Sequence, residues 1–319
     1  MNNEILITGT DGFIGSYLKS YFLENQYRVY GTVYNLREPD EYEVKIDFRK
    51  KEEFQKLPNK KFEVIIHTVG TVDQTIPKKL MMSVNARGTK FICNWAANHK
   101  CKHIIFTSSV SAYGYKLLGE DRSEERTRRT LGIFSLPYMK SKAKAERYIE
   151  KSGLNYTILR LPPVLGKGDT YLSPAIIPKL LQGTFVFCGK KDRKFSTLNL
   201  KNLGPLLTRI IQEDPYCEVF NCTDFEITWN ELIKEYAKQL DIDLIKQYKP
   251  LLSCLKRWSD KHYLLILSFA RFGCHYSNDK LINRYNFTPI YSWKDGIKEA
   301  VDGYFQNKSN VKRNLSQNN

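Results

Sequence analysis

Three polar side chains in the first half of the chain have the types and spacing needed for acid–base chemistry on an alcohol or a carbonyl. Tyr138 and Lys142 are four residues apart in a helical pattern, so they share one helical face. An ammonium beside a phenol favours the phenolate and lets a tyrosine exchange a proton near neutral pH. Ser109 lies in the hydroxyl-rich stretch Thr107–Ser111 at the end of an apolar run, where a hydroxyl can bind a substrate oxygen. A Tyr-Lys pair alone also occurs on ordinary helix surfaces, so its meaning depends on the elements around it.

The beginning of the chain has the pattern of a phosphate-binding turn. The stretch LITGTDGFIGSYL, residues 6–18, places Gly9, Gly12 and Gly15 between an apolar run and an amphipathic helix. Glycines permit a tight turn, and the free N–H groups of the helix N-terminus favour a phosphate. Glycine-rich loops also occur without a ligand, but a strand, a glycine turn and a helix in this order predict a dinucleotide site.

The residues after the next two predicted strands bear on which dinucleotide is bound. An acid at the end of the second strand binds the adenosine 2′-hydroxyl, whereas a basic residue accepts a 2′-phosphate. No acid directly follows Val33 and Arg37 is near, which favours NADP over NAD; the alternative is that Arg37 is a solvated loop residue. Asp47, after the third strand, is either an acceptor for the adenine amino group or a cap for the segment that follows it.

Apolar runs that alternate with helical patterns define the fold. Predicted strands cover 4–8, 27–33, 42–47, 62–70, 102–109 and 155–162, and predicted helices 12–25, 84–99 and 138–153. This alternation predicts an α/β protein with a doubly wound parallel sheet, Rossmann-like. We expect a dinucleotide-binding domain in residues 1–165, with returning segments near 195–225. The remaining predictions are a substrate-binding lobe in 166–194 and 226–306 and a disordered tail in 307–319.

Composition narrows the function classes. The 319 residues carry a formal net charge of +16, which suits either an anionic partner or a basic surface without a specific one. Lysine and arginine are scattered rather than clustered, so we expect no nucleic-acid partner. The 7 cysteines include no CxxC pair, which predicts no metal site and a reducing, cytoplasmic location. We also expect no signal peptide and no membrane-spanning segment, because no run reaches the ~20 apolar residues required.

Taken together, the motifs resemble the extended short-chain dehydrogenase/reductase family, the NAD-dependent epimerase/dehydratase group. The matching pieces, in the family's order, are TGTDGFIG, VIIHTVG, VNARGT, TSSVSAYG, YMKSK and ILRLPPVLGKGD. Later pieces match more loosely: STLNLKNL, VFNCTDFEITWNEL and YNFTPIYSWKDGIKEAV. The resemblance implies an NAD(P)-dependent enzyme that is a homodimer.

The resemblance also implies a role for each matching residue. Ser109, Tyr138 and Lys142 fall on the catalytic positions, with Tyr138 as general acid/base and Lys142 holding the nicotinamide ribose and lowering the pKa of Tyr138. Ser108 is the nearest rival of Ser109. The predicted cofactor contacts are Gly9, Asp11, Gly12, Phe13, Ile14, Gly15, Arg37, Asp47, Phe48, His67, Thr68, Val69, Asn85, Thr107, Tyr138, Lys142 and Pro162; the predicted substrate contacts are Ser109, Ser111, Arg193 and Lys194. Without its motif, His67 would be read as a packed strand histidine.

The hydroxyl motif favours one branch of the family's chemistry. The dehydratase branch has an Asp-Glu pair after a threonine, where this chain has Ser108, Ser109 and Val110, so dehydration is disfavoured. We therefore expect hydride transfer at a carbonyl or carbinol carbon, by a 4-reductase or 4-epimerase acting on a nucleotide sugar in surface polysaccharide synthesis. Two departures stand out: Pro163 replaces an asparagine of many epimerases, and Phe195 a diphosphate-binding arginine.

Two other functions remain open. One is a hydroxysteroid-type or other apolar alcohol dehydrogenase, because relatives of that kind share the catalytic core. The basic and apolar segment 256–273, with its apolar run at 263–270, is then either a peripheral membrane contact or a buried helix of the substrate lobe. The other is a non-catalytic cofactor-binding regulator, against which the intact set of Ser109, Tyr138 and Lys142 argues.

Overall fold

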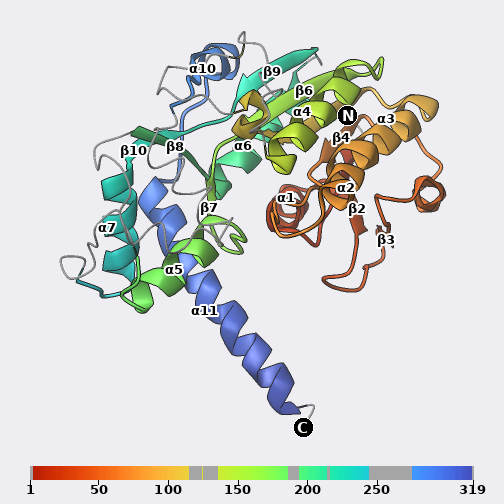
Figure 1. The fold of residues 1–319 in the computed structure, drawn as a ribbon. Coiled ribbons are helices and arrows are strands. Elements are labelled where there is room, and N and C mark those ends of the chain that lie inside the picture. The colour runs from red at the N-terminus through yellow and green to blue at the C-terminus, as the bar shows by residue number, and fades with distance from the viewer. Residues whose placement is uncertain are drawn as a thin grey trace.

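The fold is built on a large parallel sheet. The computed structural model describes residues 3–114, 124, 136–185, 194–213, 216–243 and 275–317. Within these residues the sheet has the strand order β3-β2-β1-β4-β5-β6-β9, and every neighbouring pair is parallel (Figure 1). The strands are β1 (Glu4–Thr8), β2 (Arg28–Val33), β3 (Glu43–Lys45), β4 (Val64–His67), β5 (His103–Ser109), β6 (Asn155–Leu161) and β9 (Glu218–Asn221). The predicted doubly wound, Rossmann-like fold is confirmed.

Helices cover both faces of this sheet, which explains why its central strands β4 and β5 are buried along their whole length. They are α1 (Phe13–Glu24), α2 (Lys78–Met82), α3 (Gly88–Asn98), α4 (Pro137–Glu150), α6 (Leu200–Gln212) and α10 (Asp279–Tyr285). Alternate side chains of β1 point to opposite faces. Ile5 and Ile7 pack in the cluster that includes residues of α1 and α6, whereas Leu6 packs with residues of α3 and α4. Short helical turns occupy Lys51–Lys56, Ser83–Arg87 and Val110–Tyr113.

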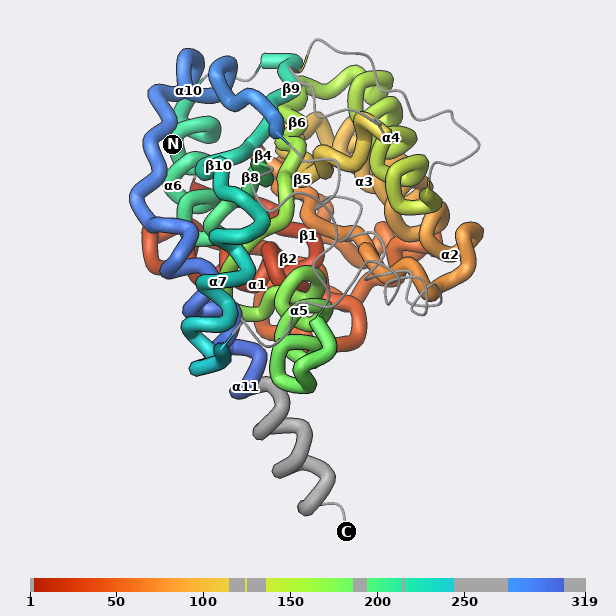
Figure 2. Tube along the Cα trace, turned by 60° about the vertical axis from the view of Figure 1, so that its left-hand side comes forward, coloured from red at the N-terminus to blue at the C-terminus, as the bar shows by residue number. Residues whose placement is uncertain are grey.

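A smaller sheet with the order β10-β8-β7 forms the second lobe. Its strands are β7 (Val164–Leu165), β8 (Lys194–Asn199) and β10 (Phe225–Thr228). Helices α5 (Leu172–Leu181), α7 (Trp229–Gln239) and α11 (Trp293–Gln317) gather at this end of the molecule, around the buried side chains of Trp229 and Tyr236 (Figures 1 and 2). Of the segments expected to return to the large sheet, β9 does so, whereas β8 belongs to the small sheet.

The end of the chain differs from its prediction. Helix α11 includes residues 307–317, for which the sequence predicts a disordered tail. No glycine or proline follows Gly303, so nothing in the backbone interrupts the helix that begins at Trp293. Among the described residues, no helix is long and apolar enough to cross a membrane.

Candidate active site

The glycine turn and the start of α1 fit together too closely for side chains. Gly9 has a φ of +77°, a conformation that favours glycine, and a Cβ placed on Gly15 would lie 2.1 Å from the Gly9 carbonyl oxygen. In helix geometry the first N–H groups of α1, those of Phe13, Ile14 and Gly15, have no intrahelical acceptor. Phe13 and Ile14 line a pocket, so this helix end faces a cavity and suits the pyrophosphate of a dinucleotide.

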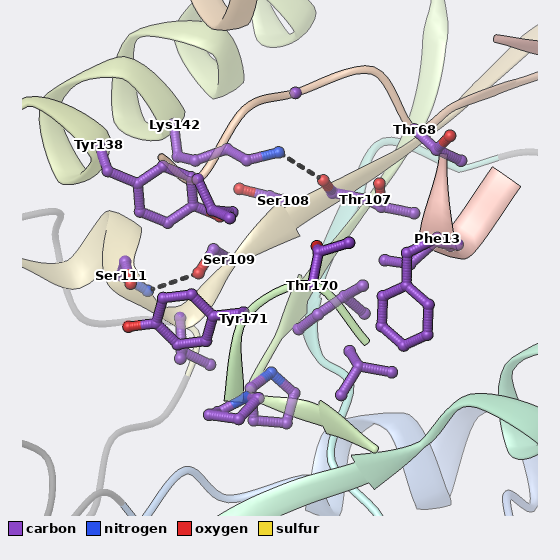
Figure 3. Close-up of a pocket in the computed structure, with 18 of the residues that line it drawn as sticks. Phe13, Thr68, Thr107, Ser108, Ser109, Ser111, Tyr138, Lys142, Thr170 and Tyr171 are labelled. Atoms are coloured by element: carbon purple, nitrogen blue, oxygen red, sulfur yellow. Dashed lines mark hydrogen bonds between the residues drawn. The ribbon is translucent and has the colours of Figure 1, made fainter. Parts of the chain in front are cut away.

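The opposite end of the same pocket holds the hydroxyl groups. Strand β5 ends at Ser109, whose Oγ accepts a hydrogen bond from the Ser111 backbone N–H at 3.1 Å. The side chain of Tyr138, from the first turn of α4, lines the pocket beside Ser109, and the Ser109 hydroxyl acts to lower the pKa of the phenol. Figure 3 shows Tyr138, Ser109 and Ser111 at one end of the pocket and Phe13 and Thr68 at the other.

Lys142 completes this group from the next turn of α4. Its ammonium donates to the Thr107 carbonyl oxygen at 2.9 Å (Figure 3). It also lies 4.8 Å from the centre of the Phe106 ring. A Cβ on Gly70 would lie 3.2 Å from Lys142 Nζ, so the glycine keeps the space above the ammonium open. The three predicted catalytic residues, Ser109, Tyr138 and Lys142, therefore line one pocket.

Burial controls the protonation of both α4 side chains. It raises the pKa of Tyr138 to about 12, and the Ser109 hydroxyl offsets part of this rise. Burial also lowers the pKa of Lys142 to about 8, and the nearby Glu146 carboxylate opposes that shift. Burial of the phenol outweighs any lowering of the Tyr138 pKa by Lys142, whose ammonium is bound to the β5 backbone, so that predicted role of Lys142 stays a prediction.

The comparisons with known proteins agree with this geometry. Residues 5–245 match the family described as "NAD dependent epimerase/dehydratase family". The chain belongs to this family. It is 26% identical over 258 residues to UDP-glucose 4-epimerase of Vibrio cholerae, covering 76% of this chain and 77% of that one. A 3beta-hydroxysteroid dehydrogenase/Delta(5)-Delta(4) isomerase 1 of Caenorhabditis elegans is 25% identical over 164 residues, 46% of this chain and 34% of that one.

A solved structure supports the same fold. The UDP-glucose 4-epimerase of Thermotoga maritima, crystallised with UDP-glucose, superposes with a TM-score of 0.73 at 20% sequence identity. The match covers 95% of this chain and 99% of that chain. The resemblance to the extended short-chain dehydrogenase/reductase family, drawn above from six short motifs, is thereby confirmed.

The epimerase/dehydratase pocket brings together many of the predicted site residues and adds others. Predicted residues that line it are Phe13, Ile14, Thr68, Thr107, Ser108, Ser109, Ser111, Tyr138, Lys142 and Pro162. Gly70 and Pro163, which the family's motifs also place near the cofactor, line it too. Sequence reasoning missed Val72, Val110, Leu161, Val164, Asp169, Thr170 and Tyr171. For the last three a signal existed: Asp169 precedes a helical apolar pattern, and its carboxylate accepts the N–H groups of Tyr171, Leu172 and Ser173 at the start of α5.

Two predicted cofactor contacts belong to the core. His67 is 0% exposed, with Nδ1 2.7 Å from Thr8 Oγ1 and Nε2 3.0 Å from Thr89 Oγ1. Its ring stacks between the rings of Phe48 and Phe106. Phe48 itself is buried. The packed-histidine interpretation of His67 therefore describes the structure, and neither His67 nor Phe48 presents a surface to a ligand.

Three charged residues predicted near the adenosine are bound to other parts of the chain. Asp11 accepts the backbone N–H groups of residues 34–36 and so holds the loop after β2. The Arg37 guanidinium makes two hydrogen bonds of 2.5 Å to the buried Glu43 carboxylate. Asp47 pairs with Arg49, whose Nη2 lies 2.6 Å from the carboxylate, and also accepts the Arg49 N–H in a local turn. All three side chains are thus already bound within the protein, Asp11 to backbone N–H groups and Arg37 and Asp47 in ion pairs. The sequence alone did not show these partners.

Asn85 and Val69 shape the pocket from outside it. The Asn85 amide accepts from the Thr71 N–H at 2.8 Å and donates to the Thr71 carbonyl and to Ser141 Oγ, each at 2.9 Å. These bonds join the loop at residues 70–72 to α4, the helix of Tyr138. Val69 packs against the glycine turn, with a methyl group 3.0 Å from where a Gly9 Cβ would lie.

The predicted substrate contact in β8, Lys194, is not in the pocket. Lys194 is on the surface, and its Nζ lies 2.9 Å from Glu226 Oε2. The next residue, Phe195, is 2% exposed and packs against Trp229. Since neighbouring strand residues face opposite sides, neither replaces a diphosphate-binding arginine in the pocket. Arg193 and the segment 256–273 lie outside the described residues.

The low pKa of Lys142 predicts a pH-dependent stability. Folding lowers the pKa of Lys142 from 10.5 to about 8, so between these values the unfolded chain binds the proton that the folded chain has lost. Stability therefore rises with pH in this window; below it, both states are protonated and the burial penalty is fully present. We compare the free energy of unfolding of the wild type with that of Lys142→Met. The difference between them should change by about 3 kcal/mol in favour of the wild type between pH 7.5 and 10.5. Urea unfolding across this range measures it, and a constant difference would contradict it.

Proposed function

We propose that this chain transfers a hydride between a nicotinamide dinucleotide and a carbinol or carbonyl carbon of a nucleotide sugar, as a 4-epimerase or 4-reductase. The observation that carries this proposal is that Tyr138, Ser109 and Lys142 line one pocket, which the glycine turn also borders. The glycine-lined cradle fits the pyrophosphate. The nucleotide sugar is supported by similarity to UDP-glucose 4-epimerases.

The chain's own groups suit proton transfer to or from an alcohol oxygen. When bound, the dinucleotide supplies the hydride acceptor or donor. With a pKa near 12, Tyr138 holds its proton at neutral pH and can give it to a developing alkoxide, while Ser109 donates a hydrogen bond to the same oxygen. Lys142, beside the Thr107 carbonyl, would bind the ribose hydroxyls. Oxidation in the opposite direction needs the ionised form of Tyr138, whose phenolate would take the proton of the substrate alcohol.

Water elimination is less well supported by the same residues. Ser108 donates its hydroxyl proton to Glu146 at 2.6 Å, and Val110 has no acid–base group. Among the described lining residues the carboxylate is that of Asp169, and its oxygens accept three N–H groups at the start of α5. The site therefore favours hydride and proton transfer without loss of water.

For the cofactor we propose NAD, although Arg37 in the sequence favoured NADP. Arg37 is neutralised by Glu43, and the Asp11 carboxylate lies at the N–H groups of the loop after β2, where a 2′-phosphate would meet a like charge. We expect NADH to bind more tightly than NADPH by about tenfold or more. Fluorescence titration measures both dissociation constants, and Asp11→Asn should narrow their ratio. Tighter binding of NADPH would show that Arg37 leaves Glu43 for the ligand.

A second candidate is the oxidation of an apolar alcohol. Much of the pocket wall near Ser109 is apolar, formed by Val72, Val110, Leu161, Pro163 and Val164. Among the described lining residues, Lys142 is the cation, so none is assigned to a sugar-nucleotide diphosphate. The similarity to a hydroxysteroid dehydrogenase points the same way.

One panel separates the candidates. The purified chain is incubated with UDP- and dTDP-hexoses, their 4-keto forms and 3β-hydroxysteroids, with NAD(H) or NADP(H). Nicotinamide absorbance reports net oxidation or reduction, and proton NMR reports epimerisation. Turnover of a nucleotide sugar supports the first proposal, whereas turnover of a steroid alone supports the second. Dinucleotide binding without any turnover supports the non-catalytic regulator. The homodimer and the role in polysaccharide synthesis stay predictions; sedimentation measures the first.

A further inference from the structure

A buried carboxylate continues the row of functional side chains on α4. Glu146 follows Lys142 by one helical turn and Tyr138 by two, so all three share a face. Its side chain is 0% exposed. Glu146 Oε1 accepts from Ser108 Oγ at 2.6 Å, and the two carboxylate oxygens accept from Arg160 Nε at 3.1 Å and Nη2 at 2.8 Å. Burying an ion pair costs free energy that its attraction only partly returns, so stability alone is a weak reason for its presence.

The partners of Glu146 are parts of the active-site strand. Ser108 stands between Thr107, whose carbonyl binds Lys142, and Ser109, which lines the pocket together with Tyr138. The bond from Ser108 to Glu146 therefore fixes the β5 end relative to α4 at the level of the pocket. Arg160 holds the carboxylate from β6 on the other side. Figure 3 shows Thr107, Ser108 and Ser109 in succession beneath Tyr138 and Lys142.

The charges around Lys142 make Glu146 its electrostatic partner. From α4 it faces Glu146 and the un-ionised Tyr138; from β4 it faces His67, whose pKa burial lowers to about 3 and which is therefore neutral. From β5 it meets the Phe106 ring and the Thr107 carbonyl, and Arg160 of β6 faces Glu146. Within the described part of the chain, Glu146 is thus the carboxylate that opposes the loss of the Lys142 proton.

We propose that Glu146, held by Arg160, is a positioning residue that keeps Lys142 charged and fixes the strand end that carries Ser109. Its importance for catalysis rests on the proposed function. The effect of Glu146 on the charge of Lys142 does not depend on that function, because this charge can be measured without turnover. If the Glu146–Arg160 ion pair had only a structural role, removing the Glu146 charge would leave the pKa of Lys142 unchanged.

The test is a titration of Lys142 by NMR with isotope-labelled lysine, its signal being assigned by its loss in Lys142→Met. In Glu146→Gln the carboxylate charge is removed and the shape is kept. The midpoint of Lys142 should then fall by about one pH unit or more relative to the wild type. An unchanged midpoint would overturn the proposal.

Ser108→Ala is the matched control, because it removes one hydrogen bond to Glu146 and keeps the charge; its midpoint should equal that of the wild type. If Glu146→Gln does not fold, the double variant Glu146→Gln/Arg160→Met removes both buried charges together, and its midpoint should still fall. A fall in the variants together with no turnover of any substrate would reject the proposed function but not this inference. Turnover with an unmoved midpoint would reject the inference alone.

Discussion

Tyr138→Phe should lower kcat by about 100- to 10,000-fold, because it removes the proton that is exchanged with the substrate oxygen. Phenylalanine keeps the ring and loses only the hydroxyl group, so the pocket that Tyr138 lines should keep its shape. Dinucleotide affinity should change little, since the glycine turn lies at the other end of the pocket. Steady-state rates and fluorescence titration on the substrate found in the panel measure both quantities.

Tyr148→Phe is the control for this variant, because it deletes the same atom from the same helix outside the described lining of the pocket. Its kcat should equal that of the wild type. Equal activity of Tyr138→Phe and wild type would remove Tyr138 from the mechanism and leave Ser109 without its partner.

Gly15→Ala should weaken dinucleotide binding strongly and destabilise the fold. The new methyl group would lie 2.1 Å from the Gly9 carbonyl oxygen and 2.9 Å from Thr68 Oγ1, so α1 must move away from the turn. We expect the dissociation constant to rise by about 100-fold or more, since a displacement of about 1 Å at such a site has effects of this size. The free energy of unfolding should fall by about 1–3 kcal/mol.

The next residue, Ser16, is exposed. Ser16→Ala should therefore change neither the dissociation constant nor the free energy of unfolding. Fluorescence titration and urea unfolding of the two variants make the comparison. If Gly15→Ala binds the dinucleotide as the wild type does, the turn is not the binding site, however close its packing.

Local pattern was enough to predict the residues whose roles depend on neighbours in sequence. Tyr138 and Lys142 share a helix face because of their spacing, and Ser109 reaches the same pocket because strand ends of a parallel sheet meet at one edge. The apolar runs likewise predicted the large sheet, since only strands buried on both faces are so uniformly apolar.

The incorrect expectations have a common physical cause. The partner or the burial of each residue is set by tertiary packing, which the local sequence does not show. Lys194 pairs with Glu226 across the antiparallel strands β8 and β10, a register that no local motif encodes. His67 receives two threonine partners from β1 and α3, and only tertiary packing determines that both face its ring. The pKa of Tyr138 depended on burial, which the i, i+4 spacing with Lys142 does not reveal.

The late return of β9 to the large sheet has a consequence for any attempt to dissect the molecule. Residues 218–221 pair with β6, and α6 covers the face of Ile5 and Ile7, so a truncation after residue 165 removes both. The fragment would expose an unpaired apolar strand edge and half of a hydrophobic surface, a combination that promotes aggregation. We therefore expect that residues 1–165 do not fold on their own and that the two lobes melt in a single cooperative transition.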